Sequence, residues 1–210
     1  MNVIFVSDVE YPIQKQMGLL QVQNMINPYI KMKKEIKIER VWAMPNAWTF
    51  SIKPINELLK KYVKKEEDWI DPFAGKFSPA KWTNDWNPER NARFCLDAND
   101  FAEDCERLTG RPLFDGILFD PPYSNRQISE HYKAVGKKAT ALDTSANFYS
   151  RIKSKLSKKI RKGGYAISCG WNTVGFGKKN GFEIVEILIV SHGGAKNDTL
   201  VTVEQKPLTP

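Results

Sequence analysis

The stretch that most constrains the fold is an apolar run that ends abruptly in two prolines. Gly116-Ile117-Leu118-Phe119 is followed directly by Asp120-Pro121-Pro122-Tyr123. Proline lacks the backbone N–H and has a fixed φ, so the pair can continue neither a central strand nor a helix interior. The residue before each proline is also restricted to an extended conformation. We therefore predict a buried strand that ends at Phe119 and continues as a stiff, extended step.

This step presents groups that suit a flat ring carrying an amine. The Asp120 carboxylate and the Pro121 carbonyl can each accept one N–H of an exocyclic amine, and the Tyr123 ring can stack on a base, at about 1–3 kcal/mol per base. Ligands of open α/β sheets bind just beyond the carboxyl ends of the strands. Taken by itself, the tetrapeptide is more typical of a simple rigid turn, because Asp-Pro and Pro-Pro are common loop signals.

A second strand end has the same character. Trp69-Ile70 reads as a short buried strand before Asp71-Pro72-Phe73-Ala74-Gly75, a small-residue turn whose backbone N–H groups could hold a carboxylate. Ser78-Pro79 then reads as the start of a helix of about one turn. Thr83-Asn84-Asp85-Trp86 reads as the next strand end, which places Asp85 where an acidic residue meets ribose hydroxyls in a doubly wound fold. Taken alone, residues 71–75 are equally compatible with a tight turn.

Helical and extended patterns alternate along the rest of the chain. Residues 49–63 predict a helix with Ser51 as its N-cap. Residues 93–96 predict a third short strand, after which Asp97 or Asn99 caps the next helix. Together these segments place a helix between most pairs of consecutive strands.

The C-terminal part continues this alternation. Residues 124–147 form a long segment beside the predicted strand end, and segments of this length in a compact domain are usually functional or disordered. Apolar residues then recur every four positions, which marks a helix over 148–160 that ends at Gly163-Gly164. Residues 165–168, 182–190 and 200–204 predict three more strands. The whole pattern predicts an α/β fold with a mainly parallel, doubly wound sheet and a C-terminal antiparallel strand pair.

Composition narrows the class of protein. The chain has 210 residues and a net charge of +8, which suits one well-buried domain and is compatible with a phosphate-backbone partner. Three cysteines without CxxC spacing favour free thiols in a reducing compartment, and two isolated histidines argue against a metal site. No apolar run reaches the length of a membrane span. We therefore expect a cytoplasmic protein with neither a membrane nor a metal partner, and its oligomeric state stays open.

Two runs of basic residues allow two interpretations. Residues 31–40 and the polar face of the predicted 148–160 helix are rich in Lys and Arg. A single charge run is more often a solvated face than a nucleic-acid contact, and lysines also suit the C-terminal end of a helix. We interpret both runs as solvated and regard residues 124–147 as the better candidate for contacting a substrate backbone.

The two strand-end motifs, in this order and with Asp85 and Asp97 between them, resemble S-adenosylmethionine-dependent amino-methyltransferases of the DNA adenine-N6 type. The resemblance covers about residues 49–205. It implies a Rossmann-like methyltransferase domain over 49–210, with residues 1–48 packing on or extending its core. It also implies S-adenosylmethionine as cofactor and DNA as partner, either duplex with a flipped adenine or single-stranded.

The resemblance assigns roles residue by residue. In the family, the first motif holds the methionine end of the cofactor, the acidic residue after the second strand holds the ribose, and the residue after the third strand lies near the adenine. The implied cofactor-binding residues are Phe50, Ser51, Lys53, Asp71, Pro72, Phe73, Ala74, Gly75, Asp85, Trp86, Asp97 and Ala98. The implied catalytic residues are Asp120, Pro121, Pro122 and Tyr123. A plain capping role is the alternative for Asp97.

The sequence also departs from the family. After Gly75, Lys76-Phe77-Ser78-Pro79 stands where the family usually has Gly-x-Gly and a full helix. A target-recognition domain of the usual size is not apparent, which resembles the compact enzymes of phages and mobile elements. Aspartate at position 120 is more usual for adenine, whereas enzymes acting on cytosine N4 more often have serine there, and RNA or protein-glutamine enzymes asparagine. The alternatives are therefore an RNA adenine-N6 or DNA cytosine-N4 methyltransferase, a protein-glutamine enzyme, or a non-catalytic nucleic-acid-binding module.

Overall fold

The computed structural model describes residues 35–138, 146–194 and 196–208. The chain divides into two units, Met1–Glu35 and Ile36–Pro210, and the described residues lie almost entirely in the second. Most of the expected 1–48 segment therefore lies outside the described residues. No helix in the described part of the chain combines the length and the apolar character that crossing a membrane requires.

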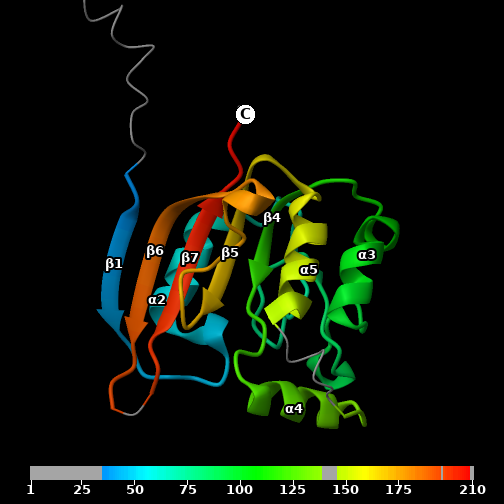
Figure 1. Ribbon diagram of the computed structural model, residues 1–210, viewed down its shortest axis with the longest axis horizontal. Helices are drawn as coiled ribbons and strands as arrows, with labels where there is room; N and C mark the ends of the chain where they lie inside the picture. Colours follow the sequence, from blue (N-terminus) through cyan, green and yellow to red (C-terminus); the bar gives the residue numbers. More distant parts are fainter. Residues whose placement is uncertain (1–34, 139–145, 195, 209–210) are drawn as a thin grey trace, which may run out of the picture. The chain divides into compact units, whose positions relative to one another are not determined.

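In the described part of the chain, seven strands form one sheet in the order β1-β6-β7-β5-β4-β2-β3 (Figure 1). Their bounds are β1 Lys37–Trp42, β2 Trp69–Asp71, β3 Trp82–Thr83, β4 Phe114–Phe119, β5 Ile160–Gly170, β6 Glu183–Ser191 and β7 Thr199–Gln205. Paired strands are parallel except where β7 is involved, since β7 is antiparallel to both β5 and β6. The predicted mainly parallel sheet with a C-terminal antiparallel pair is confirmed.

Helices cover both faces of this sheet. Their bounds are α2 Lys53–Tyr62, α3 Ala98–Thr109, α4 Asn125–Ala134 and α5 Ala146–Ser157, with short 3-10 helices η2 Thr49–Ser51, η3 Pro88–Arg90 and η4 Lys178–Asn180. Because successive residues of a strand face opposite sides, Ile117 of β4 packs in the core under α3 and α5, whereas Leu118 packs in the core under α2. Figure 1 shows α4 across the end of the sheet to which the parallel strands point.

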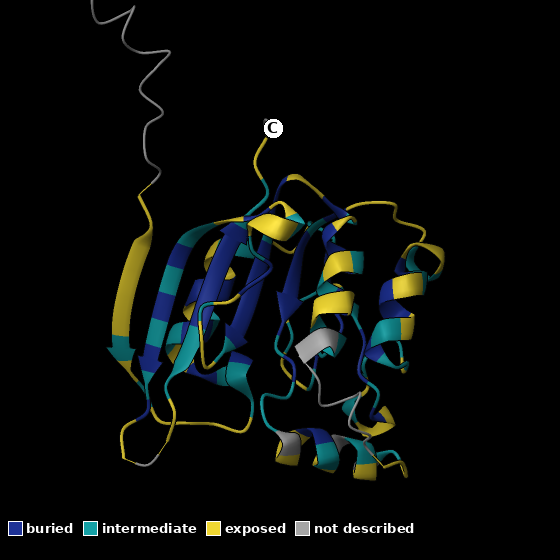
Figure 2. Cartoon of the chain, in the orientation of Figure 1, coloured by how far each residue is buried: buried dark blue, intermediate teal, exposed yellow. Residues whose placement is uncertain are grey.

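The first strand of the sheet was not predicted. Lys37–Trp42 overlaps the end of a run, residues 31–40, that the charge pattern marked only as a solvated face, yet it forms β1, parallel to β6. Strand β1 is indeed largely exposed (Figure 2), because it is an edge strand. Lys37 pairs at 2.9 Å with Glu186, a buried carboxylate of β6, so one member of the charge run holds the strand to the sheet.

Two expected helix starts are wrong. Helix α2 begins after Ile52 with no side-chain cap, because the Ser51 hydroxyl donates instead to the Trp48 carbonyl at 2.8 Å. Ser78 starts no helix either, and residues 78–81 are irregular. The Ser78 hydroxyl donates to the buried Asp71 carboxylate at 2.6 Å and accepts the Ala80 N–H at 3.3 Å, so it connects two turns of the chain, but no helix follows it.

Other boundaries also differ. Residues 93–96 form no strand, only a single bridge from Phe94 to Asn84. The segment after residue 123 begins as helix α4, whose capping box pairs Ser124 with Gln127; residues 139–145 lie outside the described residues. The next helix ends at Ser157, and Gly163-Gly164 lie inside β5. A side chain at Gly164 would meet the Asp115 carbonyl at 2.7 Å, so the glycine permits close strand packing rather than ending a helix.

The basic residues at and beyond the end of α5 are engaged inside the fold. Lys155 pairs with Glu103, Lys159 with Glu106, and Arg161 with Asp115. These ion pairs connect the segment to α3 and β4.

Candidate active site

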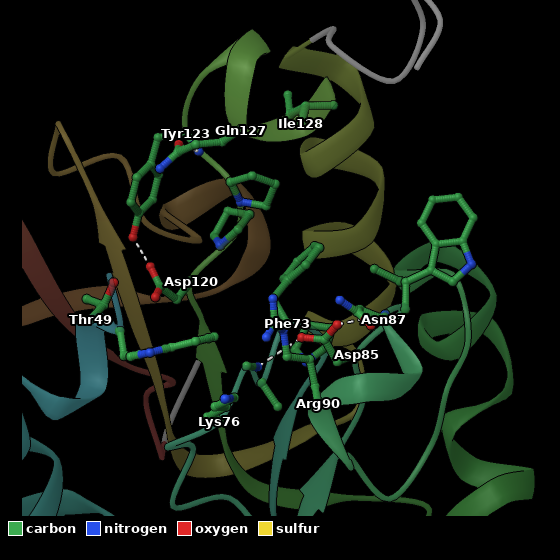
Figure 3. Close-up of a pocket in the computed structure, with 18 of the residues that line it drawn as sticks. Thr49, Phe73, Lys76, Asp85, Asn87, Arg90, Asp120, Tyr123, Gln127 and Ile128 are labelled. Atoms are coloured by element: carbon green, nitrogen blue, oxygen red, sulfur yellow. Dashed lines mark hydrogen bonds between the residues drawn. The ribbon is translucent and has the colours of Figure 1, made fainter. Parts of the chain in front are cut away.

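The carboxyl ends of β2, β3 and β4 meet at one cavity of about 360 Å³ (Figure 3). Cavities of this size are typical of small-molecule sites. Strand β2 lies between β3 and β4 in the sheet, so the turns that follow the three strands are neighbours in space. The cavity therefore forms at the place where parallel α/β sheets bind ligands.

Most of the predicted site residues lie in the wall of this cavity. Those that line it are Phe50, Pro72, Phe73, Ala74, Gly75, Asp85, Trp86, Asp97, Ala98, Asp120, Pro121, Pro122 and Tyr123. Ser51, Lys53 and Asp71 do not line it. Ser51 turns to the Trp48 carbonyl, Lys53 is exposed at the start of α2, and Asp71 is buried behind the wall.

Asp71 shapes the turn that follows β2. Its carboxylate accepts the Phe73 N–H at 2.9 Å and the Ser78 hydroxyl at 2.6 Å. Burial, with smaller contributions from the nearby carboxylates of Asp120 and Asp85, raises the pKa of Asp71 to about 7, although the hydrogen bonds from Ser78 and Phe73 oppose this shift. Asp71 is thus a positioning residue that lies near two carboxylates of the cavity wall.

Asp85 links two turns of the cavity wall. One carboxylate oxygen accepts the Gly75 N–H at 3.0 Å, and the other accepts the Asn87 N–H at 2.9 Å (Figure 3). Gly75 has φ +56°, and a Cβ there would lie 3.4 Å from the Trp48 ring. The turn therefore needs glycine for its conformation, and Asp85 fixes where that turn lies.

Asn84 is a positioning residue that sequence reasoning missed. Its side-chain NH₂ donates to the Pro72 carbonyl at 3.2 Å and the Leu96 carbonyl at 3.0 Å, and its side-chain oxygen accepts the Leu96 N–H at 3.0 Å. A buried amide satisfied in this way ties the turn after β2 to the segment before α3. No local sequence pattern predicts this role of Asn84, because both of its partners are 12 residues away in the chain.

Asp97 combines the two roles that the sequence left open. It is the N-cap of α3 and accepts the Asn99 N–H at 2.8 Å, and it also lines the cavity beside Ala98. A carboxylate that caps a helix keeps a second oxygen for other partners. Capping and facing a ligand are therefore compatible at this position.

The step after β4 is held from several directions. The Tyr123 hydroxyl donates to the Asp120 carboxylate (Figure 3), and the Tyr123 N–H donates to the Gln127 side chain of α4 at 2.9 Å. The Tyr149 hydroxyl of α5 donates to the Pro122 carbonyl at 3.0 Å. Burial raises the pKa of Asp120 to about 7, although a hydrogen bond with Thr49 opposes that shift.

Further residues of the wall were not foreseen. They come from the segment before α2, the turns after β2 and β3, and helices α4 and α5, and comprise Ala47, Trp48, Thr49, Lys76, Phe77, Asn87, Arg90, Gln127, Ile128, Tyr132, Phe148 and Tyr149. For Gln127 a usable signal existed, since Ser-x-x-Gln is a capping box that predicts a helix starting directly after the step. The others reach the cavity only through the packing of distant segments.

No protein-family model matches the sequence, and no curated protein matches it. Several solved structures are similar in fold. TrmN from Thermus thermophilus aligns with 74% of this chain at 18% identity and a TM-score of 0.49, and the chain spans 49% of its length. A 1,6-didemethyltoxoflavin-N1-methyltransferase from Burkholderia thailandensis, solved with 1,6-didemethyltoxoflavin and S-adenosylhomocysteine, aligns with 74% at 12% identity and a TM-score of 0.47, over 77% of its own length. With identities this low, the chemistry of the cavity follows from its own residues.

Proposed function

We propose that this protein is an S-adenosylmethionine-dependent methyltransferase that modifies the exocyclic N6 of adenine in DNA. The observation that carries the proposal is that the turn after β2 and the Asp-Pro-Pro-Tyr step after β4 line one cavity. A methyl donor held by the first would lie next to an amine held by the second. Had the two segments faced separate surfaces, this reaction would have had no site.

The residues of the cavity fit such a donor. S-adenosylmethionine carries a sulfonium, an α-amino group, a carboxylate and ribose hydroxyls. Asp85 and Asp120 line the cavity and lie near enough to the buried Asp71 to raise its pKa, so this end of the cavity suits a positively charged ligand. We assign Asp85 to the ribose hydroxyls, and Phe73 and Trp86 offer apolar surface for the adenine ring. When bound, S-adenosylmethionine supplies an electrophilic methyl group on its sulfur.

The step after β4 supplies what the target amine needs. The N6 lone pair of adenine is delocalised into the ring, so the nitrogen is a poor nucleophile. The Asp120 carboxylate and the Pro121 carbonyl each accept a hydrogen bond from one N–H of this amine. The two hydrogen bonds favour a pyramidal nitrogen with a localised lone pair. In the proposed transfer, the bond between N6 and the methyl carbon would form as the sulfur–methyl bond breaks, which would leave S-adenosylhomocysteine, and N6 would then lose one proton. The Asp120 carboxylate would stabilise the positive charge that develops on N6 more in the transition state than in the ground state.

Replacing Tyr123 separates stacking from hydrogen bonding. The Tyr123 hydroxyl occupies the Asp120 carboxylate, so a base amine must displace it before the base can stack on the ring. We expect Tyr123→Phe to keep at least about a third of wild-type kcat/KM, because phenylalanine stacks equally well and removes the competitor. Tyr123→Ala should lose about 10- to 100-fold, the equivalent of one base stack. Steady-state kinetics on an adenine-containing oligonucleotide measure both, and equal losses would contradict the stacking role.

The target is tested in cells and in vitro. Genomic DNA from cells expressing the wild-type protein should contain N6-methyladenine above the level found with Asp120→Ala, as read by mass spectrometry of nucleosides. Purified protein should then transfer labelled methyl groups to duplex or single-stranded DNA in preference to RNA or protein. If the label appears in RNA, in protein or on cytosine N4 instead, the proposed methyltransferase activity stands and the proposed target, adenine N6 of DNA, is wrong.

A further inference from the structure

Two cations lie in the wall of the cavity against the same aromatic ring. The Lys76 Nζ is 5.4 Å from the centre of the Trp48 ring, and the Arg90 guanidinium carbon is 4.8 Å from it. Both residues line the cavity. Neither forms an ion pair with a carboxylate of the described residues. A cation that lines a ligand cavity and has no carboxylate partner suits an anionic group of the ligand.

The turn after β2 does not provide that anion site through its backbone. The Phe73 N–H donates to Asp71 and the Gly75 N–H to Asp85, whereas the Ala74 N–H donates to the Asn84 carbonyl at 2.9 Å. Pro72 has no N–H. The expectation that these groups hold a carboxylate is therefore wrong, because partners within the fold already satisfy them.

A helix N-terminus does not provide it either. Anions often bind where a strand leads through a small-residue turn into a helix. Here residues 76–81 are irregular after Gly75, and the next described structure is β3. Lys76 comes directly after the turn at which such a helix would begin. The N–H groups of residues 73–75 are therefore bonded within the fold, no helix follows Gly75, and two side-chain cations lie in the cavity wall.

We propose that Lys76 and Arg90 bind the carboxylate at the methionine end of the methyl donor. The proposal rests on the proposed function and names the anchor for one end of its cofactor. Figure 3 shows both residues on the side of the cavity away from Tyr123, Gln127 and Ile128, so they hold the donor at the end remote from the target base.

Trp48 orients the two cations. A cation over an aromatic face is attracted to it, more strongly where water is scarce. The Trp48 ring makes an edge contact with Phe77, at 6.1 Å between ring centres. On another side it lies next to Gly75, where a Cβ would be 3.4 Å from it. Part of the side-chain entropy lost when the cations meet a carboxylate is therefore already lost before binding.

Calorimetry with two ligands tests the anchor. S-adenosylhomocysteine has the amino-acid carboxylate, whereas 5′-methylthioadenosine has the same nucleoside and no carboxylate. We expect Lys76→Met and Arg90→Gln each to weaken S-adenosylhomocysteine binding about 10-fold, and the double variant about 100-fold, as for lost bonds to a charged group. Binding of 5′-methylthioadenosine should stay within about two-fold in all three variants.

The chain offers matched control variants. Lys81 and Arg93 also lie over one aromatic ring, that of Trp82, at 5.3 and 4.5 Å and outside the cavity. Unlike Lys76, Lys81 also pairs with a carboxylate, that of Asp68 at 2.6 Å, so circular dichroism must show that its variant is folded. Lys81→Met and Arg93→Gln remove the same charges from the protein. They should leave the affinity for both ligands unchanged, which separates a local contact from a general effect of net charge.

Three results would overturn the inference. Unchanged S-adenosylhomocysteine affinity in the double variant would show that the cations do not meet the cofactor. Equal losses for both ligands would show that they merely support the cavity. Unchanged cofactor affinity with a raised KM for DNA would assign them to a phosphate instead. Failure of the wild-type protein to bind S-adenosylhomocysteine would instead refute the proposed function itself, and the anchor with it.

Discussion

Replacing Asp120 with alanine is expected to abolish methyl transfer and to leave cofactor binding intact. The substitution removes the carboxylate that would accept an N–H of the target amine and face its developing positive charge. Loss of one such preorganised partner typically lowers kcat by about 10²- to 10³-fold. Asp120 belongs to the step after β4, so S-adenosylhomocysteine should bind within about two-fold of the wild-type affinity.

Two controls separate chemistry from folding. Asp120→Asn keeps the shape of the side chain and removes its charge, so it should be nearly as inactive as alanine. Because burial raises the pKa of Asp120 from 3.8 to about 7, this group lowers the stability of the fold as the pH rises between these two values, and the full penalty is present at pH 8. Its removal should therefore leave the melting temperature at pH 8 equal or higher. Substantial activity in either variant would refute the role assigned to Asp120.

The raised pKa of Asp120 predicts how kcat/KM depends on pH. Below pH 7 the Asp120 carboxyl group is mostly protonated, and it is then a weaker acceptor that cannot stabilise positive charge. The value of kcat/KM, which reports groups of the free enzyme, should therefore rise as the pH increases through about 7. A profile that is flat between about pH 6 and 9 would mean that Asp120 titrates near its ordinary pKa.

Replacing Asp85 with alanine is expected to weaken the cofactor complex. In the proposed complex the carboxylate meets the ribose, and in the structure it accepts the N–H groups of Gly75 and Asn87. Losing bonds to a charged group costs about 10- to 100-fold in affinity. Because both ligands contain the ribose, S-adenosylhomocysteine and 5′-methylthioadenosine should weaken together, in contrast to the Lys76 and Arg90 variants.

Asp85→Asn is the matched control for this prediction. It keeps one carbonyl oxygen, which can retain one of the two backbone bonds, so its loss of affinity should be intermediate. Calorimetry measures the affinities, and circular dichroism checks that each variant is folded. Unchanged affinity in the folded Asp85→Ala protein would remove Asp85 from the binding site.

Local sequence was sufficient for the strands that build the site. Two prolines after an apolar run determine that β4 ends at Phe119, because proline prevents further strand pairing whatever the rest of the fold does. The buried pair Trp69-Ile70 before a small-residue turn likewise predicts β2. Prolines and small-residue turns act on the backbone of a few neighbouring residues, so their effect can be predicted without a structure.

Only the tertiary structure decided which groups remain available at those strand ends. The N–H groups after β2 are already bonded to Asp71, Asn84 and Asp85, and Ser78 serves Asp71 rather than a helix. Lys76 and Arg90 lie beside one ring only because both pack on Trp48, which lies 28 and 42 residues earlier in the chain. The sequence by itself determined where β4 ends, since the two prolines act on their own backbone. Hydrogen-bond partners and the pairing of charges depend on contacts between distant segments, and no local pattern encodes them.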